Sequence, residues 1–142
     1  GVETHARTLI KDGVLQGYML GSYSARKLGM QSTGNAGGNH NLIIRHGDLD
    51  LAGLLKTMGT GLLVTELLGH GINMVTGDYS RGAAGFWVEN GLIAYPVEEI
   101  TIAGNLAEMF MNIVAVGNDV LVQGSKHTGS ILIERMTVAS GE

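Results

Sequence analysis

The sequence contains no cysteine, only one proline and few charged residues. Without cysteine, the chain can form no disulfide and can offer no thiolate to a metal ion. Charged side chains make up 15% of the residues, whereas globular proteins average about 25%. Such a surface fits a chain that is partly covered by a partner or by further polypeptide, and it fits equally well a compact, glycine-rich domain.

Two kinds of binding are disfavoured by what is missing. The net charge is −4, and the lysines and arginines form no block, whereas binding to nucleic-acid phosphates needs clustered basic side chains. No apolar run reaches the roughly 18 residues that would span a bilayer. We therefore expect no direct nucleic-acid contact and no membrane partner.

Length and starting residue indicate one domain from a longer protein. The 142 residues are enough for a single domain, residues 1–142, with its own core. Residue 1 is Gly rather than Met, and a strand-like pattern begins at once. We therefore expect the chain to be the C-terminal piece of a longer protein, whose N-terminal part is absent.

Glycine is abundant, with 23 of 142 residues, which is about twice its ordinary share of roughly 7%. Its scattered positions are typical of turns, bulges and close backbone approaches in a sheet-rich fold. Asp12-Gly13 and Asn90-Gly91 each separate two apolar, β-branched runs, which predicts hairpins with type I′ turns. Strands are expected within 2–20, 41–45, 62–69, 72–80, 84–97 and 130–138.

Apolar residues at helical spacing predict three helices, within 22–28, between residue 50 and Gly59, and over 105–117. The expected N-caps are Ser22 or Ser24, Asp48 or Asp50, and Asn105. The expected stops are Gly29, Gly59 with Gly61, and Gly117. Together the elements predict an α+β fold with mainly antiparallel, hairpin-rich sheets, barrel-like or sandwich-like, and two or three helices.

No self-sufficient catalytic constellation is present. The five histidines are widely spaced and no His-Glu-x-x-His motif occurs. Glu66 and His70 share a face of the expected strand, but at a spacing that makes a surface histidine the better interpretation than a metal ligand. No serine lies in Gly-x-Ser-x-Gly, and Glu98-Glu99 alternate faces at an expected strand edge. The sequence therefore predicts no catalytic and no metal-ligating residue.

The most distinctive stretch is TGDYSRGAAGFWVENG, residues 76–91, which holds the only tryptophan between glycines. On a strand, Asp78 would share a face with Ser80, but an Asp-Ser pair without His is not an activated nucleophile. Asp78 and Ser80 are better interpreted as bonding nearby backbone and holding a bend. Arg81 could hold a peptide carboxylate or a partner's acid, and an ion pair with Asp78 or Glu89 is an equal alternative.

Four stretches carry a resemblance to a known family. They are DGVLQGYMLGSYSARKLGMQSTGNAGG (12–38), MGTGLLVTELLG (58–69), TGDYSRGAAGFWVENGLIAYPVEEITIAGNL (76–106) and VGND (116–119). They closely resemble the C-terminal domain of the TldD/PmbA family, in its PmbA (TldE) branch rather than its TldD branch. The likeness covers nearly the whole chain.

The resemblance implies a cytoplasmic protein in a TldD–TldE protease assembly, of a family long labelled modulators of DNA gyrase. The TldD-type subunit is a zinc metallopeptidase that cleaves unfolded peptides, with a cysteine completing its zinc site. The PmbA-type partner lacks these ligands, as does this chain. No cofactor is therefore expected here, and zinc is expected in the TldD-type partner. His127 stands where a ligand could replace that cysteine, but no metal role is transferred to it.

The resemblance also suggests where a peptide or a subunit would lie. The glycines of 76–91 would let another chain approach closely, and strand edges could accept an extended peptide. The expected peptide-binding or interface residues are Thr76, Gly77, Asp78, Tyr79, Ser80, Arg81 and Trp87. The expected partner is a TldD-type subunit or a second copy of the chain. Two alternatives stay open: a metalloprotease active in its own right, with metal ligands in the absent N-terminal part, and a regulatory binding module.

Overall fold

The computed structural model describes residues 1–140 and divides the chain into two compact units. The first unit holds residues 1–42 and 124–126, and the second holds residues 43–123 and those from 127 onward. Each unit is described by itself below. The single domain expected from chain length stays a prediction.

The first unit contains the predicted hairpin, in a much shorter form. β1 (Ile10–Lys11) and β2 (Val14–Leu15) pair antiparallel. The turn between them has φ 52° at Asp12 and φ 75° at Gly13, which confirms two successive left-handed residues. The strands are only two residues long each, so most of residues 2–20 is not strand.

The helix of the first unit, α1 (Ser22–Lys27), was predicted at the right place but with the wrong cap. Its N-cap is Gly21, and no side chain caps it. The Ser24 hydroxyl instead donates to the Gly21 carbonyl, at 3.2 Å. Gly29 has φ 64°, which confirms it as the left-handed residue after the helix.

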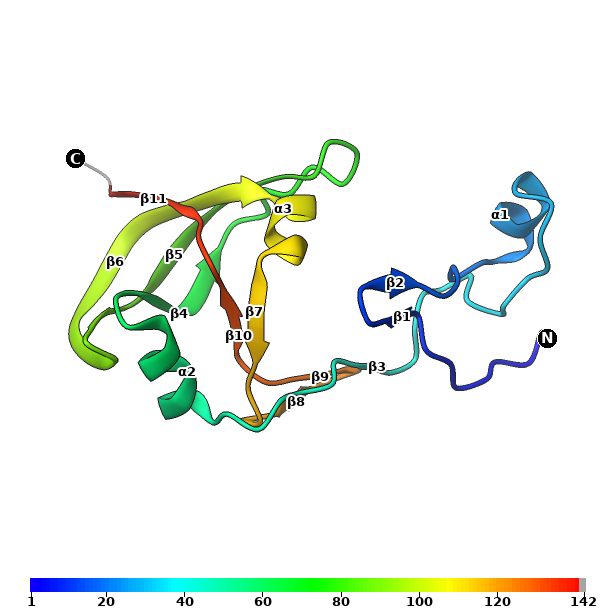
Figure 1. Cartoon of the computed structure of the whole chain (residues 1–142). Helices are drawn as coiled ribbons and strands as arrows, with labels where there is room; N and C mark the ends of the chain where they lie inside the picture. Colours follow the sequence, from blue (N-terminus) through cyan, green and yellow to red (C-terminus); the bar gives the residue numbers. More distant parts are fainter. Residues whose placement is uncertain (141–142) are drawn as a thin grey trace. The chain divides into compact units, whose positions relative to one another are not determined.

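The second unit is built on a four-stranded antiparallel sheet (Figure 1). Its strands, in the order β11-β6-β5-β4, are β11 (Thr137–Ser140), β6 (Leu92–Asn105), β5 (Asp78–Glu89) and β4 (Gly61–Leu68). The β5–β6 turn has φ 53° at Asn90 and φ 74° at Gly91, as the Asn-Gly pair predicts. The strand expected over 72–80 is wrong at its first half, because residues 73–77 form a turn and β5 begins only at Asp78.

Helix α2 (Leu51–Met58) confirms its prediction at both ends. The Asp50 side chain caps it by accepting from the Gly53 amide at 2.8 Å, and Gly59 follows with φ 71°. The tip of the β5–β6 hairpin packs on this helix. The Gly91 amide donates to the Gly59 carbonyl at 2.7 Å, and a Cβ at Gly91 would lie 2.9 Å from the Lys56 Cα.

Helix α3 (Leu106–Met111) is half as long as predicted. Asn105 caps it as expected, but residues 113–116 form a strand, β7 (Ile113–Val116), that pairs with β10 (Ile131–Ile133). The helical spacing of 105–117 was overridden because these β-branched residues find a cross-strand partner.

The single strand predicted over 130–138 is also wrong. The chain breaks between β10 and β11, where the Glu134 amide donates to the Asn112 carbonyl at 2.9 Å. β10 pairs with β7, whereas β11 pairs with β6. The alternating apolar residues of 130–138 therefore belong to two strands in two different sheets.

A further short sheet has the order β3-β9-β8, from β3 (Leu42–Ile43), β9 (Lys126–Thr128) and β8 (Leu121–Gln123). With three helices and eleven strands in the described residues, the fold is of the α+β class, as predicted. Over residues 1–140, every helix is too short or too polar to cross a bilayer.

The core of the second unit lies on one face of the long β5–β6 hairpin. Its buried members are Tyr79, Ala83, Ile100 and Ile102. Ala83 faces Ile100 across the ladder, and Arg81 faces Ile102. Side chains from β4, α3 and the segment before β11 pack against this cluster, so α3 is held at the end of β6 (Figure 1).

Candidate functional site

Two glycines in and beside the 76–91 segment are required by backbone contact. A Cβ at Gly85 of β5 would overlap the Leu63 carbonyl oxygen of β4. A Cβ at Gly71 would overlap the Ser80 carbonyl oxygen, and the Ser80 amide donates to the Gly71 carbonyl at 2.7 Å. The chain therefore uses these glycines for its own close approaches, within one unit.

The loop before β5 is closed by its own polar groups. The Asn73 side-chain oxygen accepts from the amides of Val75 at 2.9 Å and Thr76 at 3.2 Å. The Asn73 amide donates to the Asp78 carbonyl, and the Gly77 amide to the Asn73 carbonyl, both at 2.8 Å. The Thr76 hydroxyl donates to the Asp78 carboxylate at 2.6 Å. The bend that the sequence assigned to Asp78 and Ser80 is therefore held by Asp78 with Thr76, through a hydroxyl rather than backbone amides, and within residues 1–140 no hydrogen bond of the Ser80 side chain takes part.

The tip of this loop carries two apolar side chains in solvent. Met74 is 82% exposed and Val75 is 95% exposed. Burying such side chains against another surface would stabilise an interface. Because the loop is already ordered by its hydrogen bonds, little further ordering would be needed for its tip to contact a partner.

Asn105 joins the same loop to helix α3. Its amide nitrogen donates to the Thr76 carbonyl, and its oxygen accepts from the Ala107 amide, both at 3.0 Å. The Leu106 amide donates to the Gly77 carbonyl at 2.7 Å. One side chain thus caps the helix and positions the loop.

Arg81 contacts the neighbouring strand rather than an acid. Its guanidinium donates to the carbonyls of Leu67 at 3.3 Å and Leu68 at 3.5 Å. Within residues 1–140 the one ion pair is between His5 and Glu3. The alternative of an internal pair between Arg81 and Asp78 or Glu89 is therefore wrong.

The remaining predicted site residues do not gather on one surface. Tyr79 is 8% exposed and belongs to the core, whereas Asp78 and Ser80 are exposed at the start of β5. Trp87 is half-buried farther along β5, between Leu62 of β4 and Tyr95 of β6. The structure brings together Thr76, Gly77 and Asp78 in the loop, and places Arg81 and Trp87 elsewhere on the sheet.

No metal centre is formed by the described part of the chain. Nowhere in residues 1–140 do three His, Cys, Asp or Glu side chains come close enough to hold a metal ion. Glu66 lies on β4, His70 follows that strand, and His127 lies on β9.

A carboxylate network that sequence reasoning missed lies around Asp119. The Ser130 hydroxyl donates to its carboxylate at 2.6 Å and the Ser130 amide at 3.0 Å. The Gly117 amide donates a hydrogen bond to the Ser130 carbonyl at 2.8 Å. Next to it, Asn118 donates to the carbonyls of Leu49 at 2.8 Å and Asp48 at 3.0 Å. The VGND stretch was the available signal, since Asx residues beside glycine are typical of such turns.

We predict that the carboxyl of Asp119 titrates below its ordinary pKa. The Ser130 hydroxyl lowers this pKa, against a smaller opposing effect of burial. A lowered folded pKa means that the network stabilises the fold above the ordinary pKa, and that this is lost as pH falls through the folded value. An NMR titration of the Asp119 carboxyl carbon should show a higher midpoint in Ser130→Ala. Ser125→Ala is the control, and an unchanged midpoint in Ser130→Ala would contradict the assignment.

Comparison with known proteins agrees with this fold. Residues 1–140 match the profile of the PmbA/TldA metallopeptidase C-terminal domain. The chain is 59% identical over 139 residues to Metalloprotease PmbA of Escherichia coli O157:H7, covering 98% of this chain and 31% of that protein. It is 54% identical over 140 residues to a Metalloprotease PmbA homolog of Haemophilus influenzae, with the same two coverages.

A solved structure from Thermotoga maritima, of a candidate modulator of a DNA gyrase, superposes with a TM-score of 0.90 at 40% identity. The superposition covers 97% of this chain and 34% of the Thermotoga maritima chain. The chain thus spans about a third of the length of the proteins that it matches. With a family profile and close relatives matching over nearly its whole length, the chain belongs to the family of PmbA/TldA metallopeptidase C-terminal domains.

Proposed function

We propose that this chain is part of a non-catalytic, PmbA (TldE)-type subunit in a TldD–TldE zinc metalloprotease assembly that degrades unfolded peptides. It would help to form the substrate cavity and the subunit interface. The observation that best supports this role is the outer edge of β4, which ends the four-stranded sheet. In the order β11-β6-β5-β4, β5 is the only strand of the described chain on β4.

An open edge can bind an extended peptide by adding it as a further strand. The bonds are made by backbone groups, so the sequence of the peptide matters little, as the degradation of unfolded chains requires. β4 is eight residues long and becomes exposed toward its end, where Leu67 is 40% and Leu68 is 50% exposed. Leu67 and Leu68 point to opposite faces of the sheet, so each would contact a peptide side chain on its own face, and Arg81 donates to the carbonyls of both residues.

In this proposal the zinc ion and its ligands belong to the TldD-type subunit. The exposed apolar tip at Met74 and Val75 supports a subunit contact, because its burial would remove apolar surface from water. The intact protein that carries this chain should therefore cleave an unfolded peptide only when it is mixed with a TldD-type subunit. It should show no saturable zinc binding by calorimetry when alone.

Each alternative has a different outcome in this experiment. Cleavage without a partner, together with stoichiometric zinc binding, would favour an enzyme active in its own right. Binding to gyrase without cleavage in any mixture would favour a regulatory module. Either result would overturn the non-catalytic subunit role.

Strand addition itself is tested by methylating peptide amides. Along an added strand, alternate amides face the edge, so one set of alternate N-methyl groups should abolish its bonds while the other set should not. Losing two such bonds should weaken binding about tenfold to a hundredfold, measured by fluorescence anisotropy on the assembled complex. Hydrogen exchange should show protection in residues 61–68 and none in β11. Equal losses for both methylated sets would contradict strand addition.

A further inference from the structure

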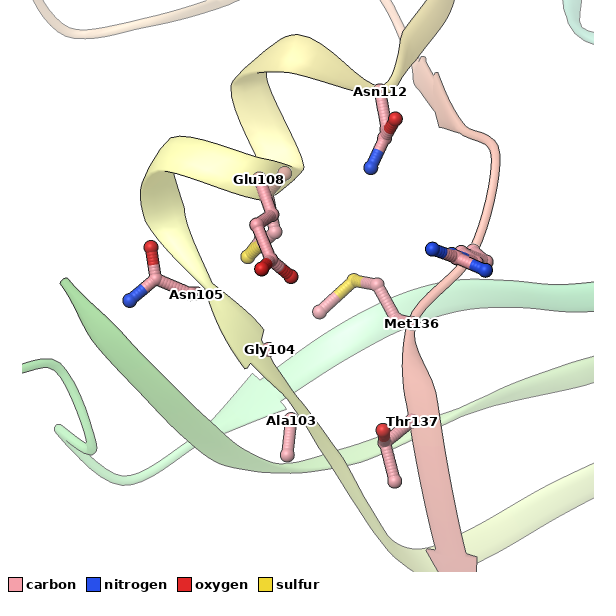
Figure 2. A pocket seen from close by; sticks show the side chains of 9 residues that line it. Ala103, Gly104, Asn105, Glu108, Asn112, Met136 and Thr137 are labelled. Carbon is pink, nitrogen blue, oxygen red and sulfur yellow. The ribbon is translucent and has the colours of Figure 1, made fainter.

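A polar cavity of about 390 Å³ lies in the second unit, where α3 meets the end of β6 and the segment that enters β11 (Figure 2). Its size falls within the roughly 300–1,000 Å³ that small-molecule sites occupy. The residues that matter for its chemistry are Gly104, Glu108, Met109, Asn112, Arg135 and Met136. None of them belongs to the 76–91 segment or to the β4 edge.

The walls of the cavity are held by backbone bonds and do not depend on a ligand. Thr137 of β11 pairs with Ala103 of β6, which sets the distance between the two strands. The Glu134 amide donates to the Asn112 carbonyl at 2.9 Å, which ties the segment before β11 to the end of α3. Asn105 caps α3 at its other end. A preformed site loses little conformational entropy on binding.

Two side chains of opposite charge line this cavity and do not form an ion pair with each other. Glu108 comes from α3, and Arg135 comes from the segment before β11. In the described residues neither side chain has an ion-pair partner within 4.0 Å, and neither makes a side-chain hydrogen bond. Asn112, the C-cap of α3, follows Glu108 by four residues and donates its backbone amide to the Glu108 carbonyl, so the two residues lie on the same side of the helix end. Figure 2 shows both reaching into the space that Met136 faces from the other side.

The floor of the cavity is apolar and adaptable. A Cβ at Gly104 would lie 3.5 Å from the Cγ and Sδ of Met109 and 3.7 Å from the Cε of Met136. Both thioether side chains therefore lie over this glycine. Methionine side chains are flexible and polarisable, and they adapt to apolar groups of different shape.

We infer that this cavity binds a small α-amino zwitterion with an apolar side chain, either a free amino acid or a dipeptide. Arg135 would hold the carboxylate, for which a guanidinium offers paired donors. Glu108 would accept from the ammonium group, and the Asn112 amide would donate to the carboxylate or, in a dipeptide, bond the peptide group. The apolar side chain would lie on Met109 and Met136. This inference does not depend on the proposed protease role.

The test is an NMR titration of the intact protein with three probes. L-Leucine and leucyl-leucine carry both charges, whereas N-acetyl-leucine amide carries neither. Saturable shifts of the Gly104, Asn112 and Arg135 amides are expected with at least one zwitterion. Whichever of L-leucine and leucyl-leucine binds more tightly shows whether the ligand is a free amino acid or a dipeptide. Binding of the uncharged probe with equal strength, or no saturable shift with either zwitterion, would overturn the inference.

Substitutions inside and outside the cavity test whether the ligand binds there. Arg135→Gln should weaken binding about tenfold, which is the effect of losing a charged hydrogen-bond partner, and Arg135→Lys should recover part of it. Gly104→Ala keeps both charges and adds a methyl group on the floor, at ordinary contact distance, and it should also weaken binding. Arg45→Gln removes a positive charge outside the cavity and should change nothing. Unchanged binding in Arg135→Gln would overturn the inference.

Discussion

Gly85→Ala is expected to lower the free energy of unfolding by about 3 kcal/mol or more, the upper range for forcing atoms into a packed site. The added Cβ would overlap the Leu63 carbonyl oxygen and would lie 3.0 Å from the Val64 Cα. These atoms are backbone and cannot rotate away. Strands β4 and β5 would have to separate, with loss of ladder hydrogen bonds. Urea denaturation of the intact protein measures the loss.

Gly82→Ala is the matched control, in the same strand and with the same chemical change. There the new Cβ would meet the Leu68 side chain, with its Cβ at 3.2 Å. The Leu68 Cβ is fixed to its backbone, but it needs to shift by only a few tenths of an ångström and lies at the exposed end of β4, so the cost should stay below about 1 kcal/mol. If both variants lowered the free energy of unfolding equally, the close approach of the Leu63 carbonyl would not be the reason for glycine at position 85.

Ile102→Ala should lower the free energy of unfolding by about 2–4 kcal/mol, because it removes buried methylenes and leaves a cavity. Ile102 is 5% exposed and lies in the cluster with Tyr79, Ala83 and Ile100. This cluster supports the surface against which α3 packs, so amide shifts in α3 should accompany the loss. Denaturation and an NMR spectrum of the same sample would measure both.

Ile93→Ala provides the comparison for this substitution on the same strand. Ile93 is 51% exposed, so little apolar burial is lost there, and the cost should be about 1 kcal/mol or less. If Ile93→Ala cost as much as Ile102→Ala, the core would not be centred on the β5–β6 face.

Hairpins and caps were predictable because their causes are local. Asp12-Gly13 and Asn90-Gly91 supply the left-handed residues that a type I′ turn requires, and both turns are found. Asp50 and Asn105 cap their helices through bonds to amides two or three residues ahead. Such interactions need no knowledge of the rest of the fold.

Errors arose where a distant segment supplied the deciding contact. Residues 113–116 have helical spacing in the sequence but pair with β10, from across a long connection. The alternating run over 130–138 is shared between two strands because β10 and β11 have different partners. Hydrophobic period alone does not say which strand lies beside which.

The candidate site shows the same division. Asp78 holds a local bend, as the sequence suggested, but its partner is Thr76 rather than Ser80. For Arg81 the sequence left open a carboxylate of a peptide or partner and an internal ion pair. The structure replaces the internal ion pair with bonds to carbonyls of β4. The Asp119–Ser130 network and the cavity beside Glu108 join residues far apart in the chain, so no spacing rule could have found them.

By itself the sequence determined the α+β class, the two tight turns, the N-caps of α2 and α3 and the family, because each depends on residues that are neighbours in the chain or on a long continuous resemblance. Only the tertiary structure decided which strands pair, where glycine is sterically required at Gly85, and that Glu108 and Arg135 share a cavity. The physical reason is that burial and backbone contact between distant segments outweigh local preferences that differ by about 1 kcal/mol or less per residue.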